Sequence, residues 1–346
     1  MKRLLILAAA TGICCTAAAQ DTVKVSTIPN QEAEKFYNSG VTNYESENYH
    51  AAISDFTQAL TLKPDFEKAW YNRGTAKYVL KDYNGAIQDF NKCMEIDPND
   101  NLPYFSRAQA YYQLGKKEDA MNDYNTAVLK NPNYVDAWYY RGGLKFENAD
   151  YKGAVEDFNK AITIKPDYAY AYNDRGSSKR MLEDIDGAIA DYIKAKSIDP
   201  TLAFVWCNLG SAYRKKGEFK LAVEAYDQAI KLKPDYQTYN SRGSARFDAG
   251  DYKGAISDFD KAIQLKTDYS YAYNNRAGAR LKLKDYKGAI QDCDLAIKYD
   301  SSYGYAYLNR GIAKEMLRDK TACDDWKKAG ELGVEIAKVY GSGCIK

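Results

Sequence analysis

AFVWCNLGSAYRKKGEFKLAVEAYDQAIKLKPDY, residues 203–236, carries the pattern on which the architecture of this chain rests. Ala222 and Ala229 lie seven positions apart, and the large ring of Tyr226 falls between them, four positions after the first alanine. Spacings of three and four residues place side chains on one face of a helix. Pro234 then ends the pattern, because proline cannot continue a helix. The stretch therefore predicts a packed helix that stops before its proline.

The alanine equivalent to Ala222 recurs along the 346 residues, with six gaps of 34 residues and two of 33. The alanines are Ala52, Ala86, Ala120, Ala154, Ala188, Ala222, Ala255, Ala289 and Ala322. A single globular core has no reason to reuse a small residue at a fixed step. A stack of similar units does, because each unit brings its neighbour's backbone close at the same point. We therefore expect an elongated solenoid whose function lies on a surface.

The repeated pattern resembles the tetratricopeptide repeat family. The fullest match has the family's spacing at Trp206, Leu209, Gly210, Tyr213, Ala222, Tyr226, Ala229 and Pro234. The resemblance covers residues 33–336 as nine tandem repeats and leaves 337–346 as the end of a capping helix and a tail. It implies an all-α, right-handed superhelical solenoid of antiparallel helix pairs. It also implies that the first helices line a concave groove, where extended peptides or partner helices usually lie.

The start of the chain has the pattern of a secretory signal. Lys2 and Arg3 form a positive end, an apolar stretch follows, and the alanines at 17–19 make a small-residue cleavage site. The apolar stretch is too short to span a membrane. We therefore expect a signal peptide at 1–19, a linker at 20–32, and an exported protein in the periplasm, at the cell surface or in the medium.

The charge balance bears on the kind of partner. The whole chain has 49 Lys and Arg against 47 Asp and Glu, and removal of the signal leaves 47 of each. A protein that binds nucleic acid would show a strong basic bias. We therefore expect neither a nucleic-acid partner nor a membrane span.

Five cysteines follow the expected signal peptide: Cys93, Cys207, Cys293, Cys323 and Cys344. Cys323 lies near the start of the last repeat's second helix, and Gly330 and Gly333 allow a turn into a returning helix. At about 1.5 Å per residue, two legs of similar length bring Cys344 back beside Cys323. An exported protein can form that disulfide. Two unrelated thiols remain the alternative, because spacing alone does not fix connectivity.

Arginine and aspartate also follow the repeat. The pairs are Arg73 and Asp89, Arg107 and Asp123, Arg141 and Asp157, Arg175 and Asp191, Arg242 and Asp258, Arg276 and Asp292, and Arg310 and Asp325. Repeat six loses both partners together, with Leu209 and Ala225. Joint loss favours a structural ion pair inside each repeat, made by the two-pronged arginine head, over a row of ligand-binding arginines.

First-helix positions that packing does not use are expected to face the concave side. They are mostly aromatic in repeats one to four and polar in repeats five to nine. The predicted groove residues are Tyr37, Tyr71, Phe105, Tyr139, Tyr140, Asn173, Asn208, Arg214, Asn240, Asn275 and Asn309. Asparagines can grip a peptide backbone, aromatic rings bind apolar anchors, and cations favour acidic stretches. The alternative is that these are ordinary solvated or inter-repeat residues.

Catalysis has little support in the sequence. His50 is the single histidine, and it lies near a helix turn with no evident partner. A metal-ligating cluster, a Gly-rich phosphate loop and a nucleophile elbow are all missing from the sequence pattern, so we expect no enzyme activity, metal or cofactor. We expect an exported scaffold that binds another protein through an extended segment in the groove. The alternative is a glycan-binding solenoid, because tyrosines such as Tyr71 and Tyr139 stack on sugar faces and asparagines bond to hydroxyls.

Overall fold

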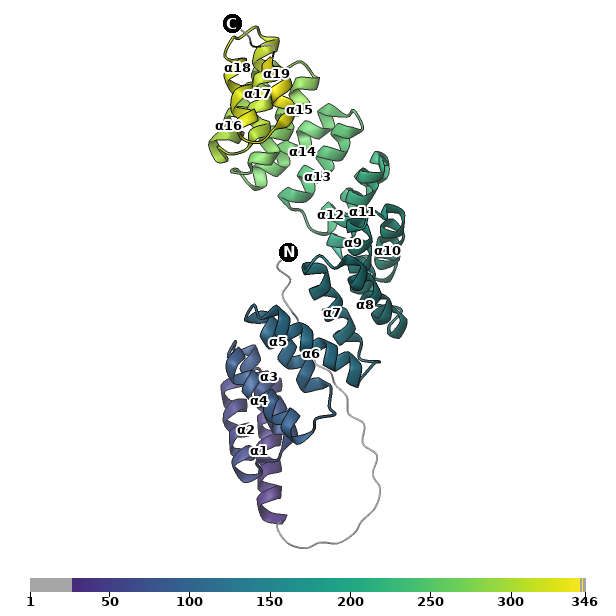
Figure 1. Ribbon diagram of the computed structural model, residues 1–346, viewed down its shortest axis with the longest axis vertical. Coiled ribbons are helices and arrows are strands. Elements are labelled where there is room, and N and C mark those ends of the chain that lie inside the picture. The colour runs from purple at the N-terminus through teal and green to yellow at the C-terminus, as the bar shows by residue number, and fades with distance from the viewer. Residues whose placement is uncertain (1–26, 343, 345–346) are drawn as a thin grey trace. The chain divides into compact units, whose positions relative to one another are not determined.

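The computed structural model describes residues 27–342 and Cys344, and the regular elements of this part are all helices (Figure 1). The helices are α1 (Thr27–Glu45), α2 (Tyr49–Leu62), α3 (Glu67–Val79), α4 (Tyr83–Ile96), α5 (Leu102–Gln113), α6 (Lys117–Lys130), α7 (Val135–Glu147), α8 (Tyr151–Ile164), α9 (Ala169–Met181), α10 (Ile185–Ile198), α11 (Ala203–Lys216), α12 (Phe219–Leu232), α13 (Tyr236–Asp248), α14 (Tyr252–Leu265), α15 (Ser270–Lys282), α16 (Tyr286–Tyr299), α17 (Gly304–Met316), α18 (Ala322–Glu331) and α19 (Glu335–Ser342). The expected signal peptide, residues 1–19, and the first part of the expected linker lie outside the described residues. Helix α1 begins six residues before Ala33, where the first repeat was expected to start.

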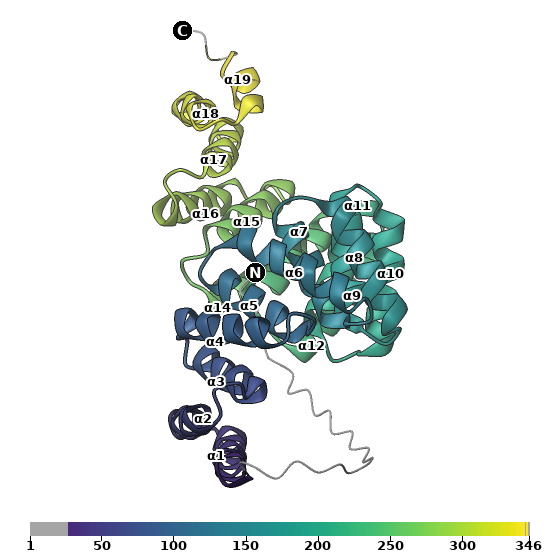
Figure 2. The same ribbon diagram turned by 60° about the horizontal axis from the view of Figure 1, so that its bottom comes forward.

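The chain forms two compact units, Met1–Lys116 and Lys117–Lys346, and each is described by itself. Within a unit, each odd-numbered helix pairs with the helix that follows it, as α1 does with α2, seen almost along their axes in Figure 2. The first helices of neighbouring repeats also touch one another, for example α7 with α9 and α13 with α15. Each unit is therefore the expected all-α stack of helix pairs, with its own first helices side by side.

An aspartate cap begins most of the second helices, and a proline follows the end of many of them. In repeat four the side chain of Asp150 precedes α8 and accepts a hydrogen bond from the backbone N–H of Gly153, which otherwise lacks a partner in the first turn. The same cap recurs at Asp82, Asp184, Asp251 and Asp285. At the other end, α8 stops at Ile164, two residues before Pro166.

Small residues and rings interlock in the core of each pair. The nine repeat alanines are buried, at 4% exposure or less. In repeat four the ring of Phe158 lies so close to Gly142 that an added Cβ would stand 3.0 Å from it. In repeat eight the usual glycine is replaced by the larger Ala277, and the usual ring is replaced by the smaller Cys293. Both residues are fully buried in one cluster. The repeat period therefore follows from close helix contact, as expected.

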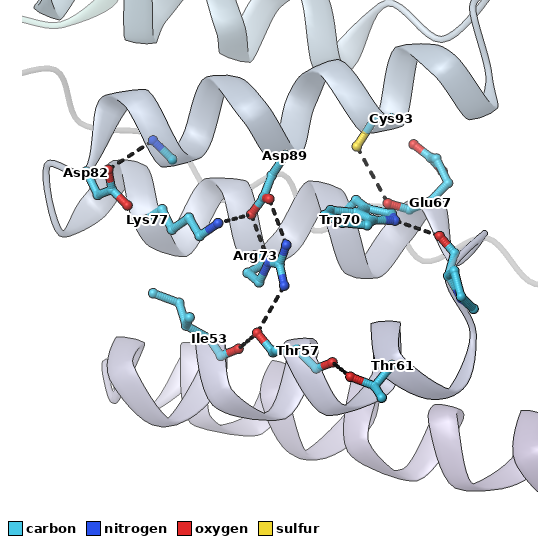
Figure 3. A network of polar contacts seen from close by, with 12 residues as sticks. Ile53, Thr57, Thr61, Glu67, Trp70, Arg73, Lys77, Asp82, Asp89 and Cys93 are labelled. Atoms are coloured by element: carbon cyan, nitrogen blue, oxygen red, sulfur yellow. Dashed lines mark hydrogen bonds and ion pairs between the residues drawn. The ribbon is translucent and has the colours of Figure 1, made fainter.

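Six of the seven predicted ion pairs inside the repeats are confirmed. In repeat two the buried Asp89 accepts two hydrogen bonds from Arg73, at 2.8 and 2.9 Å, and Lys77 lies 2.8 Å away (Figure 3). The same arginine–aspartate pairing joins residues 141 and 157, 175 and 191, 242 and 258, 276 and 292, and 310 and 325. The remaining expected pair, Arg107 and Asp123, has one residue in each unit.

Each such arginine also reaches the preceding repeat, which the sequence did not predict. The third nitrogen of Arg73 donates to the hydroxyl of Thr57 in α2 at 3.0 Å, as Figure 3 shows. Equivalent bonds run from 107 to Asn91, 141 to Asn125, 175 to Asn159, 242 to Asp227, 276 to Asp260 and 310 to Asp294. Because one guanidinium bonds two repeats, the ion pairs fix the register between repeats as well as the pairing within them.

Helix α19 covers the end of the last repeat. Val334 and Ala337 are buried with Trp326 of α18, whose ring centroid lies 5.3 Å from that of Tyr340. Cys344 is joined to Cys323 by a disulfide, with the two Cα atoms 5.7 Å apart. The apolar face that a further repeat would cover is therefore closed by a short helix tied to α18, as solenoid ends require.

Candidate partner-binding surface

The predicted groove residues of the first unit take part in packing between repeats. The hydroxyl of Tyr37 accepts a hydrogen bond from Asn72 at 3.0 Å, and the hydroxyl of Tyr71 lies 3.0 Å from that of Ser106. Phe105 is 5% exposed. These side chains therefore serve the contact between first helices.

The predicted residues of the second unit follow the same rule. Tyr139 donates to a carboxylate oxygen of Asp174 at 2.7 Å, and its ring also meets the edge of Tyr140 at 5.3 Å. The asparagines bond to each other, from Asn208 to Asn173, from Asn275 to Asn240, and from Asn309 to Asn274, at 2.8 to 2.9 Å. Each of these amides therefore makes a hydrogen bond to the neighbouring repeat.

These hydrogen bonds between first helices join positions that are offset by one residue from the repeat period. Equivalent positions in neighbouring repeats are 34 residues apart, and every one of these partners lies 35 residues along the chain. The bonds therefore run from one position of a first helix to the next position on the following first helix. An asparagine amide has two N–H donors and two lone pairs. One contact per repeat uses only part of that capacity.

A row of tyrosines lies at the start of the last three first helices. The sequence favours a packing role for its members at repeat junctions and does not single out the two exposed ones. Tyr236, Tyr269, Tyr271, Tyr303 and Tyr305 form this tyrosine row, with successive ring centroids 4.8 to 6.4 Å apart. Tyr271 is 49% exposed and Tyr305 is 55% exposed. Burial raises the pKa of Tyr303 to about 12, so its phenol stays protonated at neutral pH. The signal in the sequence was the Tyr-x-Tyr at residues 269–271 and 303–305.

Comparison with models of known families shows to which family the chain belongs. Tetratricopeptide repeat models match residues 33–66, 67–100, 105–169, 203–236 and 242–306, which together make up more than half of the chain. The chain belongs to the tetratricopeptide repeat family. Among curated protein sequences, none matches it.

Solved tetratricopeptide repeat structures agree on the fold. A tetratricopeptide repeat protein from Parabacteroides merdae is 20% identical, with a TM-score of 0.53, and the match covers 72% of this chain and 99% of that one. A chain from the crystal structure of the APC/C hetero-tetramer Cut9–Hcn1 is 16% identical, with a TM-score of 0.55, and the match covers 91% of this chain and 76% of that one. At these identities the likeness shows the fold alone.

Arg214 is the remaining predicted residue of this tetratricopeptide repeat surface. Its guanidinium is exposed and pairs with Asp248 of the next repeat at 2.6 Å. A neighbouring carboxylate therefore already neutralises it. An exposed ion pair of this kind contributes about 0.2–1 kcal/mol to stability, and either partner remains able to exchange its contact.

The tetratricopeptide repeats also contain a cavity away from the predicted groove. A cavity of about 190 Å³ lies beside the disulfide, lined by residues that include Arg318, Lys320 and Trp326, and none of its lining residues belongs to the predicted groove. Within residues 27–342, no group of three or more His, Cys, Asp or Glu could hold a metal ion. The described helices include none with the length and apolar character needed to cross a membrane.

Proposed function

We propose that this tetratricopeptide repeat chain is an exported scaffold that binds another protein through the first-helix layer, with the tyrosine row as its main contact surface. Repeats of this family are typical of protein–protein interaction. The observation that carries the proposal is the half-exposed pair Tyr271 and Tyr305, held in a continuous row of rings. Tyrosine gives a binding surface large contact area at low cost in side-chain entropy, and it is enriched among residues that dominate binding.

The proposed export rests on two features. Residues 1–19 have the charge, apolar stretch and small-residue site of a signal peptide. The bond between Cys323 and Cys344 supports the same placement, because disulfides persist mainly outside the reducing cytosol. We place the mature chain in the periplasm, at the cell surface or in the medium.

The glycan alternative loses its leading residues. The rings of Tyr71 and Tyr139, on which it depended, pack against other rings: Tyr71 against Phe90, and Tyr139 against Phe158 and Tyr168. No contact of the described residues favours a sugar over a protein. Family members are generally non-catalytic scaffolds, and we propose the same for this chain.

The test is site-specific photo-crosslinking in the native exported fraction. A benzoylphenylalanine replaces Tyr271 in one sample and Leu265 in the matched control, because Leu265 is 53% exposed on the second helix α14. We expect a protein adduct from position 271 that is at least fivefold stronger than from position 265. Equal adducts, or an adduct from position 265 alone, would contradict the proposed surface.

A further inference from the structure

Repeats five and six differ from the other repeats at one set of linked positions. In repeats one, two, four and seven the core ring is phenylalanine, and an aromatic residue near the end of the first helix packs edge-on against the start of the second, as Phe146 does against Tyr151 at 5.3 Å. In repeats five and six the core ring is Tyr192 or Tyr226, and the aromatic near the helix end becomes Arg180 or Arg214. Repeat three also has a core tyrosine, Tyr124, but keeps an aromatic residue, Tyr112, so the phenol and the guanidinium occur together in repeats five and six alone.

The polar groups of repeat five form a directed chain of hydrogen bonds. The hydroxyl of Ser177 donates to the backbone oxygen of Asn173 at 3.0 Å and lies 3.1 Å from the hydroxyl of Tyr192. Because the serine proton is used, Tyr192 donates to Ser177, and the phenol oxygen is left to accept from Arg180. Burial raises the pKa of Tyr192, which keeps its proton on the phenol at neutral pH. These hydrogen bonds therefore use both hydroxyl protons and leave the phenol oxygen of Tyr192 as an acceptor beside Arg180.

Arg180 has no carboxylate to neutralise it. The equivalent Arg214 pairs with Asp248, one repeat further along. The position that corresponds to Asp248 for Arg180 is occupied by Lys215, a second cation, which pairs with Glu183. None of the ion pairs within the described units includes Arg180, and its Nε is buried without a hydrogen-bond acceptor. An orphaned donor on a charged group costs free energy that an incoming acceptor would recover.

Asp174, the acidic residue on the same helix α9, does not fill this role. Asp174 accepts hydrogen bonds from Tyr139 and from Asn173, at 2.7 and 2.8 Å. Its two oxygens are therefore committed to the first-helix contacts described above. The charge of Lys215 is already paired with Glu183, so Arg180 is the partly exposed cation between α9 and α11 that has no carboxylate bonded to it within the described unit.

We propose that Arg180 is a carboxylate-binding site, which takes an Asp or Glu side chain from an acidic segment of the bound protein. A carboxylate matches the flat guanidinium with two parallel hydrogen bonds, and turning the head toward it gives Nε the acceptor that it lacks. Tyr192 is a positioning residue that restricts the arginine head before binding. The inference rests on the proposed function, because the carboxylate belongs to a protein partner.

The test measures binding of a fluorescein-labelled peptide with six consecutive glutamates, by fluorescence anisotropy at low salt, to the full mature chain. Arg180→Gln removes the charge at the proposed site. Arg318→Gln is the matched control, because Arg318 is exposed in the same unit and also lacks an ion pair among the described residues. We expect Arg180→Gln to weaken binding at least tenfold, Arg318→Gln to weaken it less than twofold, and a hexaglutamine peptide to bind at least tenfold more weakly than hexaglutamate.

Three results would overturn the carboxylate site. They are equal affinity of the wild type and Arg180→Gln, equal weakening by both substitutions, and equal binding of the glutamine peptide. Competition separates the source of the anion: displacement of the peptide by 1 mM inorganic phosphate would assign the site to phosphate and overturn the acidic segment. A crosslink at Tyr271 does not depend on Arg180, so its survival would show that only this inference failed.

Discussion

Repeats four and six have the same pair of helices in outline, but different side chains fill the contact between the two helices. In repeat four the buried Asp157 accepts from Arg141 and Lys145, and the arginine lies over the ring of Trp138 at 4.6 Å. In repeat six the places of these three charged residues are taken by Leu209, Tyr213 and Ala225. The tryptophan is common to both repeats, and its ring N–H donates to a proline carbonyl oxygen at 2.9 Å in each.

The difference extends into the preceding repeat. Arg141 also donates to Asn125 of α6, at 2.9 Å. Leu209 has no such bond to make, and the residue that corresponds to Asn125 is Ile193, 40% exposed. The exchange therefore covers four positions on three helices. It teaches that the small residues and rings shared by both repeats build the helix pair, while the ion network is one of two ways to fill the remaining space.

The largest effect is expected from Arg141→Ala. The substitution leaves Asp157 buried with Lys145 as its ionic partner and removes the bond to α6. Breaking a buried pair on one side costs about 3–5 kcal/mol in free energy of unfolding, and the surviving lysine places the expected loss near about 3 kcal/mol. Urea unfolding followed by circular dichroism measures it. An unchanged midpoint would show that the arginine contributes nothing to the fold.

A smaller effect is expected from Asn125→Ala. Asn125 is exposed, so its loss removes one hydrogen bond to Arg141 and leaves the pair with Asp157 intact. We expect a loss of about 0.5–1 kcal/mol in free energy of unfolding. The matched control is Asn122→Ala on the same helix. A loss as large as that of Arg141→Ala would mean that the bond between repeats, rather than the pair within one, dominates stability.

The sequence predicted what recurs with the period. Arg141 and Asp157 were paired correctly because their spacing repeats and because repeat six loses both at once. Asn125 was missed because its position holds threonine, asparagine or aspartate in different repeats, which hides the shared role of acceptor. Asn208 was assigned to a groove because an asparagine looks the same in sequence whether it meets solvent or a neighbour. Only the one-residue offset between first helices reveals that its amide meets Asn173.

The smallest effect is expected when repeat four is converted to the chemistry of repeat six. The variant combines Asn125→Ile, Arg141→Leu, Lys145→Tyr and Asp157→Ala, and so removes the buried carboxylate together with its partners. Replacing a buried ionic network by apolar residues is often neutral or stabilising, so we expect the free energy of unfolding to equal or slightly exceed that of the wild type.

The control for the conversion is Arg141→Leu alone, which places the same leucine beside an unchanged Asp157. If the four-fold variant unfolds as easily as this single variant, the two chemistries are not interchangeable, and the ion network of repeat four is required by its neighbours. If it matches the wild type while the single variant does not, the cost lies in the stranded carboxylate. The charged repeats would then owe their stability to the same small residues and rings as repeat six, and their arginines would serve to hold each repeat in register with the one before it.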